Sequence, residues 1–455
     1  MNKRIITLMA AALALLSAAG QVAFTGVDPA HHVIRLGADR TTGLDSIYVI
    51  YDIHGVGMTY TSDTGASVVW KSYNDSRGEA YAEVVDGISH MGNVSTLGQV
   101  KSNTGYVIEE GGISRFKCWV VNYAEYFLSL EALSCGTEES CSLVTLNVDG
   151  KADSICYYTI TGNKRVLDRE ITLAYSTLQW DDSTHWQDST ITRNYEALNP
   201  VLLVYEPPLC NTVFTLTGDR FLKEWGLEKF KKSDLYYTHA VKCGTSVWQE
   251  QRGNLNEKGI DGGYGGSAPV HMVFTGYPTD AVVYRVWEMA TDLDFENIIL
   301  QYYEDEVDYT FTEAGTYYMR YVVANSAGSC DDYSEPVTIT VSESDLQCTN
   351  VFSPGSTPGV NDVWMVSYKS LVEFHCWIFN RWGNLVYEYT DPGGGWDGTY
   401  HGRIVDPGVY YYVITALGSD GVKYKKRGDI TILRYKKGAE GTSGSGMDGG
   451  GTSGY

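Results

Sequence analysis

The sequence predicts an all-β protein built from tandem immunoglobulin-like sandwiches. Aromatic residues are plentiful, led by 35 Tyr among 455 residues, and Tyr, Val, Thr and Trp suit pleated, half-buried strands. Short apolar runs recur at about 8–12 residue spacing, separated by Gly, Asn and Asp, as in β-sandwiches. Amphipathic helices of useful length are missing from the pattern. The length leaves room for about three or four domains.

The N-terminus predicts export. Lys3 and Arg4 form a positive start, residues 5–16 are apolar, and Ala18-Ala19-Gly20 supplies small residues before a cleavage site at Gln21. This is the pattern of a secretory signal peptide, residues 1–20, and it is too short for a membrane span. The residue after the cleavage site is not Cys, which disfavours a bacterial lipid anchor.

The net charge of −22 disfavours nucleic acid as a partner, because phosphate binding needs clustered Lys and Arg. Residues 347–437 hold ten Lys or Arg and eight Asp or Glu. With +2 on the signal peptide and −2 on the tail, residues 21–346 carry about −24. The C-terminal region therefore differs electrostatically from the body, as expected if it meets a different partner.

The body divides into four predicted parts. The first, 21–125, is an Ig-like sandwich with strands expected at 32–36, 46–51, 67–70, 80–85 and 115–121. The second sandwich, 126–208, has strands expected at 142–148, 156–160 and 170–175. Its Asp149-Gly150 is expected to be a hairpin turn because Gly tolerates positive φ. Glu206-Pro207-Pro208 is expected to end it.

Residues 209–262 predict a small β-rich domain or partial sandwich, with strands at 212–217 and 234–241, a short helix within 221–231, and a flexible linker at 262–267. Residues 267–344 form a cleaner unit. Its stretch YTFTEAGTYYMRYVVANSAGSC, residues 309–330, resembles the late strands of PKD-like and immunoglobulin-like surface domains. That resemblance implies a small β-sandwich used as a spacer or binding module.

The last domain, 347–436, shows clear strand alternation. Residues 372–379 have period two and are followed by a turn at 380–384 and a returning strand at 385–389. Asp420-Gly421 sets a final hairpin. Residues 437–455 are rich in Gly, Ser and Thr and predict a disordered tail, since they cannot bury enough surface to fold.

Several short segments of this domain form a dense motif. Its residues are Asn361, Asp362, Phe379, Asn380, Arg381, Trp382, Gly383, Trp396, Asp397, Gly398, Pro407, Gly408, Tyr410, Gly428 and Asp429. Their order resembles the gliding-motility-associated C-terminal domain of Bacteroidetes, the type B sorting domain of the type IX secretion system. Family members often read Pro-Asn-Gly-Asp-Gly where this chain has residues 354–359, and they usually end near the final Ile-Leu-Arg.

The resemblance implies a route. The Sec machinery would bring the chain to the periplasm, and the type IX translocon with outer-membrane partners would carry it to the cell surface, the outer membrane or the medium. Arg381 and Trp382 would then be turn and packing residues, with a contact to the translocon, rather than catalysts.

Nine cysteines in an exported chain favour disulfides over metal ligands. At least one stays unpaired in a monomer, and Cys376, in an apolar strand, is the expected buried free thiol. The candidate pairs are Cys135/Cys141 as a local bridge, Cys118/Cys156, Cys210/Cys243 and Cys330/Cys348. The sequence lacks C-x-x-C, which disfavours zinc chemistry.

The Asn and Asp residues of the motif allow two interpretations of their role. Asn361, Asp362 and Asp397 offer oxygen ligands to calcium, but Asn and Asp next to Gly more often form Asx turns. Arg427-Gly428-Asp429 spells an adhesion tripeptide, yet it enters a predicted strand instead of a loop tip. We therefore expect neither a metal nor a cofactor.

The sequence contains no H-E-x-x-H, G-x-S-x-G or P-loop motif. These observations predict a non-enzymatic surface protein, an adhesin or structural component. Two alternatives stay open: a secreted hydrolase or glycan-binding cargo, and an accessory component of the secretion or gliding apparatus. The ligand of the body, protein or glycan, is not encoded in a motif.

Overall fold

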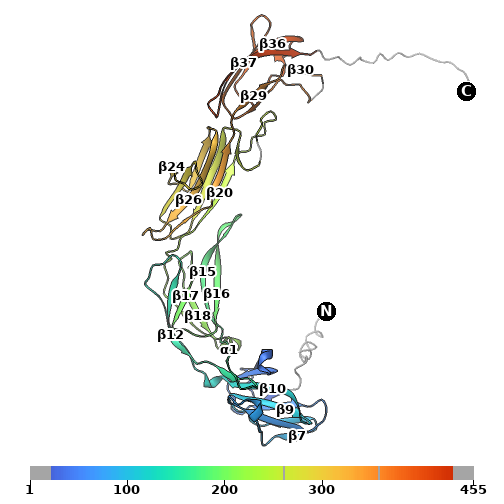
Figure 1. Ribbon diagram of the computed structural model, residues 1–455, viewed down its shortest axis with the longest axis vertical. Coiled ribbons are helices and arrows are strands. Elements are labelled where there is room, and N and C mark those ends of the chain that lie inside the picture. The colour runs from blue at the N-terminus through green and yellow to red at the C-terminus, as the bar shows by residue number, and fades with distance from the viewer. Residues whose placement is uncertain (1–21, 260–261, 357–358, 434–455) are drawn as a thin grey trace, which may run out of the picture. The chain divides into compact units, whose positions relative to one another are not determined.

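The computed structural model describes residues 22–259, 262–356 and 359–433, and it is built almost entirely of strands (Figure 1). The predicted all-β class is confirmed. The predicted signal peptide, 1–20, and tail, 437–455, lie outside the described residues. Among the helices of the described part, each is too short to cross a bilayer.

The chain forms two compact units. Of the described residues, unit 1 contains 22–241, 279–281 and 327–330, and unit 2 contains the remainder. Each unit holds several sheets.

Unit 1 begins with two facing sheets. The first has the order β1 (Val22–Thr25), β4 (Gly57–Thr61), β8 (Val94–Leu97) and β7 (Ser89–Met91). The second has the order β2 (Ile34–Gly37), β3 (Ser46–Ile50), β10 (Ile113–Asn122), β9 (Thr104–Glu110), β5 (Val68–Tyr73) and β6 (Glu83–Val84). Short 3-10 turns lie at Arg40–Thr42, Glu79–Tyr81 and Tyr123–Glu125. Trp70, Tyr60 and Tyr106 fill the core between the sheets.

The second part of unit 1 is another sandwich. One sheet has the order β11 (Leu128–Cys135), β12 (Val144–Ala152) and β17 (Val201–Val204). The other has the order β16 (His185–Tyr195), β15 (Ile171–Asp181), β18 (Thr215–Gly218) and β19 (Lys229–Lys232). β13 (Cys156–Tyr158) pairs with β14 (Lys164–Val166), and α1 (Arg220–Glu224) is one short helix.

Two predictions for this sandwich need correction. Asp149-Gly150 is not a turn, because β12 continues through it and Gly150 lies opposite Leu130 beside a bulge in β11. The helix expected within 221–231 ends at Glu224, and the chain then enters β19. Strand β18 pairs with β15, so strands from both sides of Glu206-Pro207-Pro208 share a sheet.

Unit 2 begins with a sandwich of two sheets. One has the order β20 (Cys243–Gln249), β22 (Val270–Pro278) and β25 (Glu306–Phe311). The other has the order β21 (Tyr264–Gly266), β28 (Val337–Val341), β26 (Gly315–Ala324), β23 (Tyr284–Ala290) and β24 (Ile298–Tyr302), with β27 (Asp331–Tyr333) on β26. The linker expected at 262–267 is wrong in part, because residues 264–266 form β21, paired in parallel with β28.

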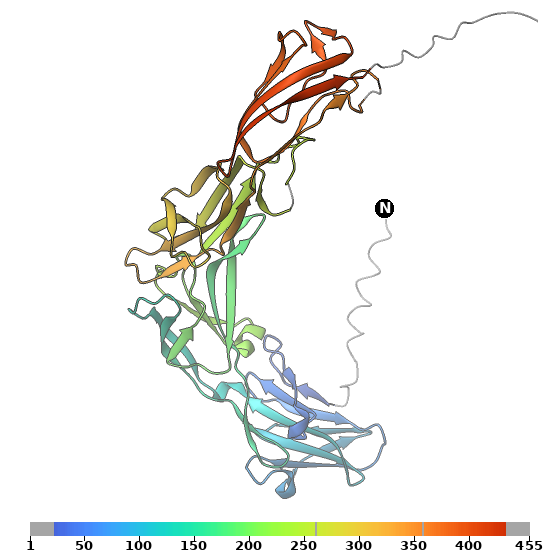
Figure 2. The ribbon, with the colours of Figure 1, turned by 45° about the horizontal axis from the view of Figure 1, so that its top comes forward.

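The C-terminal domain centres on a sheet with the order β30 (Val351–Phe352), β37 (Lys423–Ile432), β36 (Gly408–Gly418), β32 (Leu371–Phe379) and β33 (Leu385–Tyr389) (Figure 2). Two small pairs complete it, β29 (Asp345–Cys348) with β31 (Val366–Lys369) and β34 (Thr399–Tyr400) with β35 (Arg403–Ile404). The predicted hairpin of β32 and β33 is confirmed. So is the hairpin of β36 and β37 at Asp420-Gly421.

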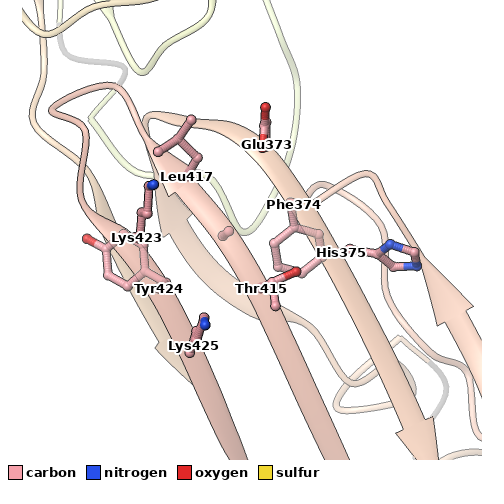
Figure 3. Close-up of a pocket in the computed structure, with 9 residues that line it drawn as sticks. Glu373, Phe374, His375, Thr415, Leu417, Lys423, Tyr424 and Lys425 are labelled. Atoms are coloured by element: carbon pink, nitrogen blue, oxygen red, sulfur yellow. The ribbon is translucent and has the colours of Figure 1, made fainter.

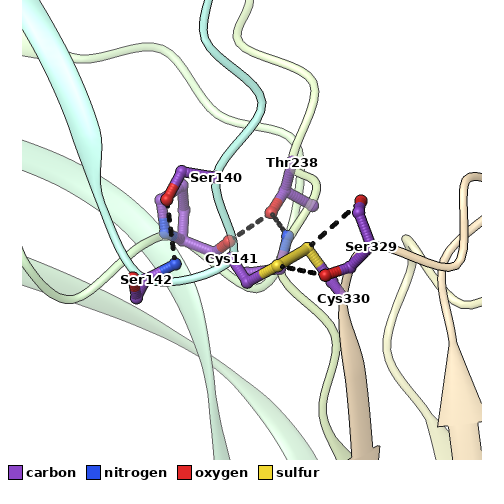
Figure 4. The surroundings of a disulfide bond; sticks show 8 residues. Ser140, Cys141, Ser142, Thr238, Ser329 and Cys330 are labelled. Atoms are coloured by element: carbon purple, nitrogen blue, oxygen red, sulfur yellow. Dashed lines mark hydrogen bonds between the residues drawn. A yellow bond between two sulfur atoms is a disulfide. The ribbon is translucent and has the colours of Figure 1, made fainter.

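The disulfide pattern differs from the predicted one. Cys141 bonds to Cys330, with Cα atoms 5.4 Å apart and a sequence separation of 189 (Figure 4). The expected pairs Cys135/Cys141 and Cys330/Cys348 are therefore wrong. Cys118, Cys156, Cys210 and Cys243, expected in two further pairs, are free thiols here. Spacing along the chain predicted the wrong pairs, because the partner of Cys141 lies in a loop that is distant in the sequence.

Candidate functional site

The turn between β32 and β33 presents a tryptophan to solvent. The Asn380 side-chain oxygen accepts hydrogen bonds from the backbone N–H groups of Trp382 and Asn384, both at 3.0 Å. Gly383 has φ +82°, which L-residues with a side chain rarely adopt. The turn is therefore rigid, and it leaves Trp382 70% exposed. The Arg381 guanidinium lies 4.3 Å from the centre of the Trp382 ring, in a cation–π arrangement.

The segment that leads into β36 borders this turn. Residues 380–382 and 406–410 together line a shallow hollow of about 120 Å³. The Tyr410 hydroxyl donates to the backbone oxygen of Asp406 at 3.0 Å. Burial and the nearby Asp406 carboxylate raise the pKa of Tyr410, while Arg381 opposes them. We call Asn380, Arg381, Trp382 and residues 406–410, which include the start of β36, the sorting tip.

Another motif residue, Trp396, is fully buried. Its backbone exchanges two hydrogen bonds with Trp364, at 2.8 and 3.0 Å. Its indole N–H donates to the Thr399 backbone oxygen at 2.9 Å, and its ring packs 5.2 Å from Tyr410 and 5.5 Å from Phe352. Trp396 therefore supports Tyr410, at the start of β36 in the sorting tip, instead of facing a ligand.

The acidic motif residues act as turn caps. The Asp397 carboxylate accepts from the Thr399 N–H at 2.9 Å and its hydroxyl at 2.7 Å, which is an Asx turn. The Asp362 carboxylate accepts from the N–H groups of Gly355 and Gly359 at 2.9 and 2.6 Å. Within residues 22–259, 262–356 and 359–433, clusters of three or more metal-ligating side chains are not found.

Some glycines of the motif are required by close packing. Gly398 has φ +76°, and a Cβ there would lie 2.9 Å from Pro354. A Cβ on Gly428 would lie 2.7 Å from the Tyr412 hydroxyl. Gly428 and Asp429 belong to β37, opposite Tyr412 and Tyr411. The Arg427-Gly428-Asp429 tripeptide therefore lies within a strand.

The structure brings some predicted site residues together and separates others. Asn380, Arg381, Trp382, Pro407, Gly408 and Tyr410 share the sorting tip. Phe379 ends β32 beside it, opposite Leu385 and Tyr411. Asn361 and Asp362 belong to the loop before β31, and Gly428 and Asp429 lie along β37.

Sequence reasoning missed a larger hollow on the same domain. It measures about 620 Å³ on the sheet face of β32, β36 and β37 (Figure 3). Glu373, His375, Thr415, Leu417, Lys423 and Lys425 line it from the outer face. The period-two alternation of each strand places such residues on one face, but the register that brings the three strands side by side is not encoded locally.

Family comparisons agree with this geometry. Residues 346–432 match the CHU_C type IX secretion signal domain. Residues 134–233 match a fibronectin type III domain. The chain is thus a secreted β-sandwich protein whose C-terminal domain is a type IX secretion signal. That signal implies passage through the type IX secretion system to the cell surface or extracellular space.

The comparison with solved structures gives matches of low sequence identity and low TM-score. A tetra-tandem repeat from the extending region of a large adhesion protein has 10% identity and a TM-score of 0.22, and the match covers 84% of this chain and 96% of that one. The eight N-terminal Ig domains of Down Syndrome Cell Adhesion Molecule have 10% identity and a TM-score of 0.23, with coverage of 85% and 52%. Three domains of the bacteriophage RB49 Hoc protein have 8% identity and a TM-score of 0.21, with coverage of 68% and 100%. The comparison with curated proteins gives no match.

Proposed function

We propose that this chain is a non-enzymatic surface protein, an adhesin or structural component, delivered by its C-terminal domain. The observation that carries the proposal is the order of its parts. A fibronectin type III domain at 134–233 precedes a secretion signal at 346–432. A further sandwich lies between them, made of sheets β20–β22–β25 and β21–β28–β26–β23–β24. Tandem sandwiches suit a spacer or binding module that the signal carries outward.

Within the secretion signal, the sorting tip is our candidate for the contact with the translocon. Trp and Arg are enriched among the residues that dominate protein interfaces. Here a 70% exposed tryptophan stacks with Arg381 on a turn fixed by Asn380. Such preorganisation lowers the entropic cost of binding, because the side chains are already placed.

Deletion of residues 346–455 tests the delivery role. The truncated chain is expected to accumulate in the periplasm, whereas the full chain reaches the surface. The measurement is protease accessibility on intact cells, combined with fractionation. Unchanged surface display of the truncated chain would refute the role.

Point variants sharpen the assignment to the sorting tip. Trp382→Ala with Arg381→Ala is expected to reduce surface display while the domain stays folded, because both side chains are exposed. Tyr400→Ala removes another exposed aromatic of the same domain, 43% exposed, and is the matched control. Equal loss for both variants would show that the tip has no special role.

A further inference from the structure

Strand β24 (Ile298–Tyr302) is an open edge strand. It pairs with β23 on one side only, and in the described part of the chain no other segment hydrogen-bonds to its outer edge. Figure 1 labels β24 at the margin of its sandwich. Alternate residues of such a strand direct their N–H and C=O groups away from the sheet, so the outer edge can accept another strand.

Three of the five β24 side chains are aliphatic, and the other two are Gln301 and Tyr302. Ile298, Ile299 and Leu300 are 39%, 46% and 36% exposed, and none of the five residues is buried. In the same sandwich, β22 alternates between buried and half-buried residues. An exposed hydrophobic edge strand is a template on which another strand can pair.

Two other edges of this chain are protected by charge, whereas the edge strands β1 and β17 carry no charged residue. β37 carries Lys423, Lys425 and Lys426 along an edge that β30 covers only at Thr431 and Ile432. β19 is likewise rich in lysine, with the sequence KFKK. Lysine on an edge strand prevents unwanted pairing. β24 has no charged residue at all, so its edge lacks this protection.

The ends of β24 are strongly acidic. Asp294 and Glu296 precede it, and Glu304 and Glu306 follow it. All four are exposed, and none has an ion-pair partner in the part of the chain that the structure describes. Asp305 differs, because it pairs with Arg285 at 2.9 Å. The free carboxylates favour a partner with positive charges at both ends of its strand.

From the open edge, the exposed aliphatic side chains and the acidic ends, we propose that β24 is a strand-addition site. Its occupant is an extended segment of a partner protein, with alternating apolar side chains flanked by Lys or Arg. Backbone hydrogen bonds to the β24 edge would supply affinity, and the flanking charges would supply register and specificity. The acidic ends disfavour β24 of a second copy, because antiparallel pairing would bring like charges together. This inference goes beyond the proposed route of export and does not depend on it.

The test uses the full chain and three labelled synthetic peptides. The first alternates valine and threonine between terminal lysine pairs. The second has the same core with terminal glutamate pairs, and the third has the lysine ends with a central proline, which cannot donate to the ladder. We expect binding, measured by fluorescence anisotropy, for the first peptide only. Equal binding of the proline peptide would overturn the proposal, because charge alone would then explain it.

A variant of the edge completes the test. Leu300→Lys copies the protection seen on β37 and is expected to weaken binding of the first peptide by about tenfold or more. Val283→Lys makes the same change at a 57% exposed residue of the same sandwich, outside β24, and should bind like the parent chain. Equal affinity of the parent and Leu300→Lys would overturn the proposal.

Hydrogen exchange of the parent chain needs no variant and covers the case in which Leu300→Lys fails to fold. Saturating peptide should slow exchange of the β24 amides, and unchanged exchange there would contradict strand addition. Sedimentation of the chain without peptide tests whether a second copy of the chain occupies the β24 edge. A mass that rises with concentration in the parent, but not in Leu300→Lys, would identify a second copy as the occupant and overturn the proposal.

Discussion

At the scale of single residues, a buried ion pair is the most consequential feature of unit 1. Arg169 donates through Nε to the Asp219 carboxylate at 2.7 Å, and the Tyr123 hydroxyl donates to the same oxygen at 2.9 Å. The side chains of Arg169 and Asp219 are 2% and 0% exposed. The other Asp219 oxygen caps α1 by accepting from the Leu222 N–H at 3.0 Å. One carboxylate thus connects several elements.

Asp219→Asn is therefore expected to destabilise unit 1 strongly. Breaking a buried pair leaves an uncompensated charge, which typically costs about 3–5 kcal/mol. The measurement is the thermal midpoint of the transition that removes the near-ultraviolet signal. Asp75→Asn, which loses an exposed pair with Arg77, is the control and should change little. Similar midpoints for the two variants would contradict a structural role for the buried pair.

At the scale of elements, the alternation of apolar and polar residues predicted the presence of strands well but their first and last residues poorly. Residues 372–379 were expected as a strand and form β32, since period-two burial is encoded locally. Asp149-Gly150 looked like a turn, yet β12 runs through it because pairing with β11 overrides the local signal. Gly-rich residues 264–266 looked like a linker, and their pairing with β28 depends on a distant strand.

The candidate site likewise has features that local sequence predicts and features that it does not. Trp382 and Arg381 were singled out by the motif, and the turn that exposes them follows from local Asn and Gly chemistry. The hollow lined by His375 and Lys425 was missed, because it needs the register of three strands. Local geometry is readable from sequence, whereas convergence of distant strands is not.

The sheet of β20, β22 and β25 carries a pH-dependent contact. His271 on β22 lies between two carboxylates, with Nε2 2.8 Å from Asp308 and Nδ1 3.3 Å from Glu250. Trp248 packs against the imidazole with ring centres 5.8 Å apart. The hydrogen bond to Asp308 is the main cause that raises the His271 pKa above its usual 6.5, and Glu250 adds to it.

Because the folded-state pKa is raised, the stabilising contribution of His271 is fully present below its unfolded value of about 6.5. It is lost as the pH rises through the higher folded-state pKa. An NMR titration should show His271 titrating above its usual pKa, and Asp308→Asn should lower it. Asp294→Asn, in the same sandwich, is the control and should leave the His271 pKa unchanged. A His271 pKa that is indifferent to Asp308→Asn would contradict the assignment.

At the scale of the whole molecule, one covalent bond joins residues that lie far apart in the sequence. Residues 327–330 are grouped with unit 1, although the strands on either side of them, β26 and β27, belong to unit 2. Cys330 in this loop bonds to Cys141 across 189 residues. Sequence spacing favoured local pairs, but a disulfide depends on proximity of Cα atoms in the folded chain. A compartment reached by export supports such bonds.

Loss of this bond is expected to destabilise the chain, because the cross-link closes a long loop and so restricts the conformations of the unfolded chain. Native disulfides of this kind typically contribute about 2–4 kcal/mol. Peptide mapping without reductant should recover one linked pair containing Cys141 and Cys330. Cys141→Ser should lower the thermal midpoint, and reductant should lower the parent to the same value while leaving Cys141→Ser unchanged. Cys210→Ser, which alters a free thiol, should keep the full response to reductant. If reductant leaves the thermal midpoint of the parent chain unchanged, the bond does not stabilise the folded chain.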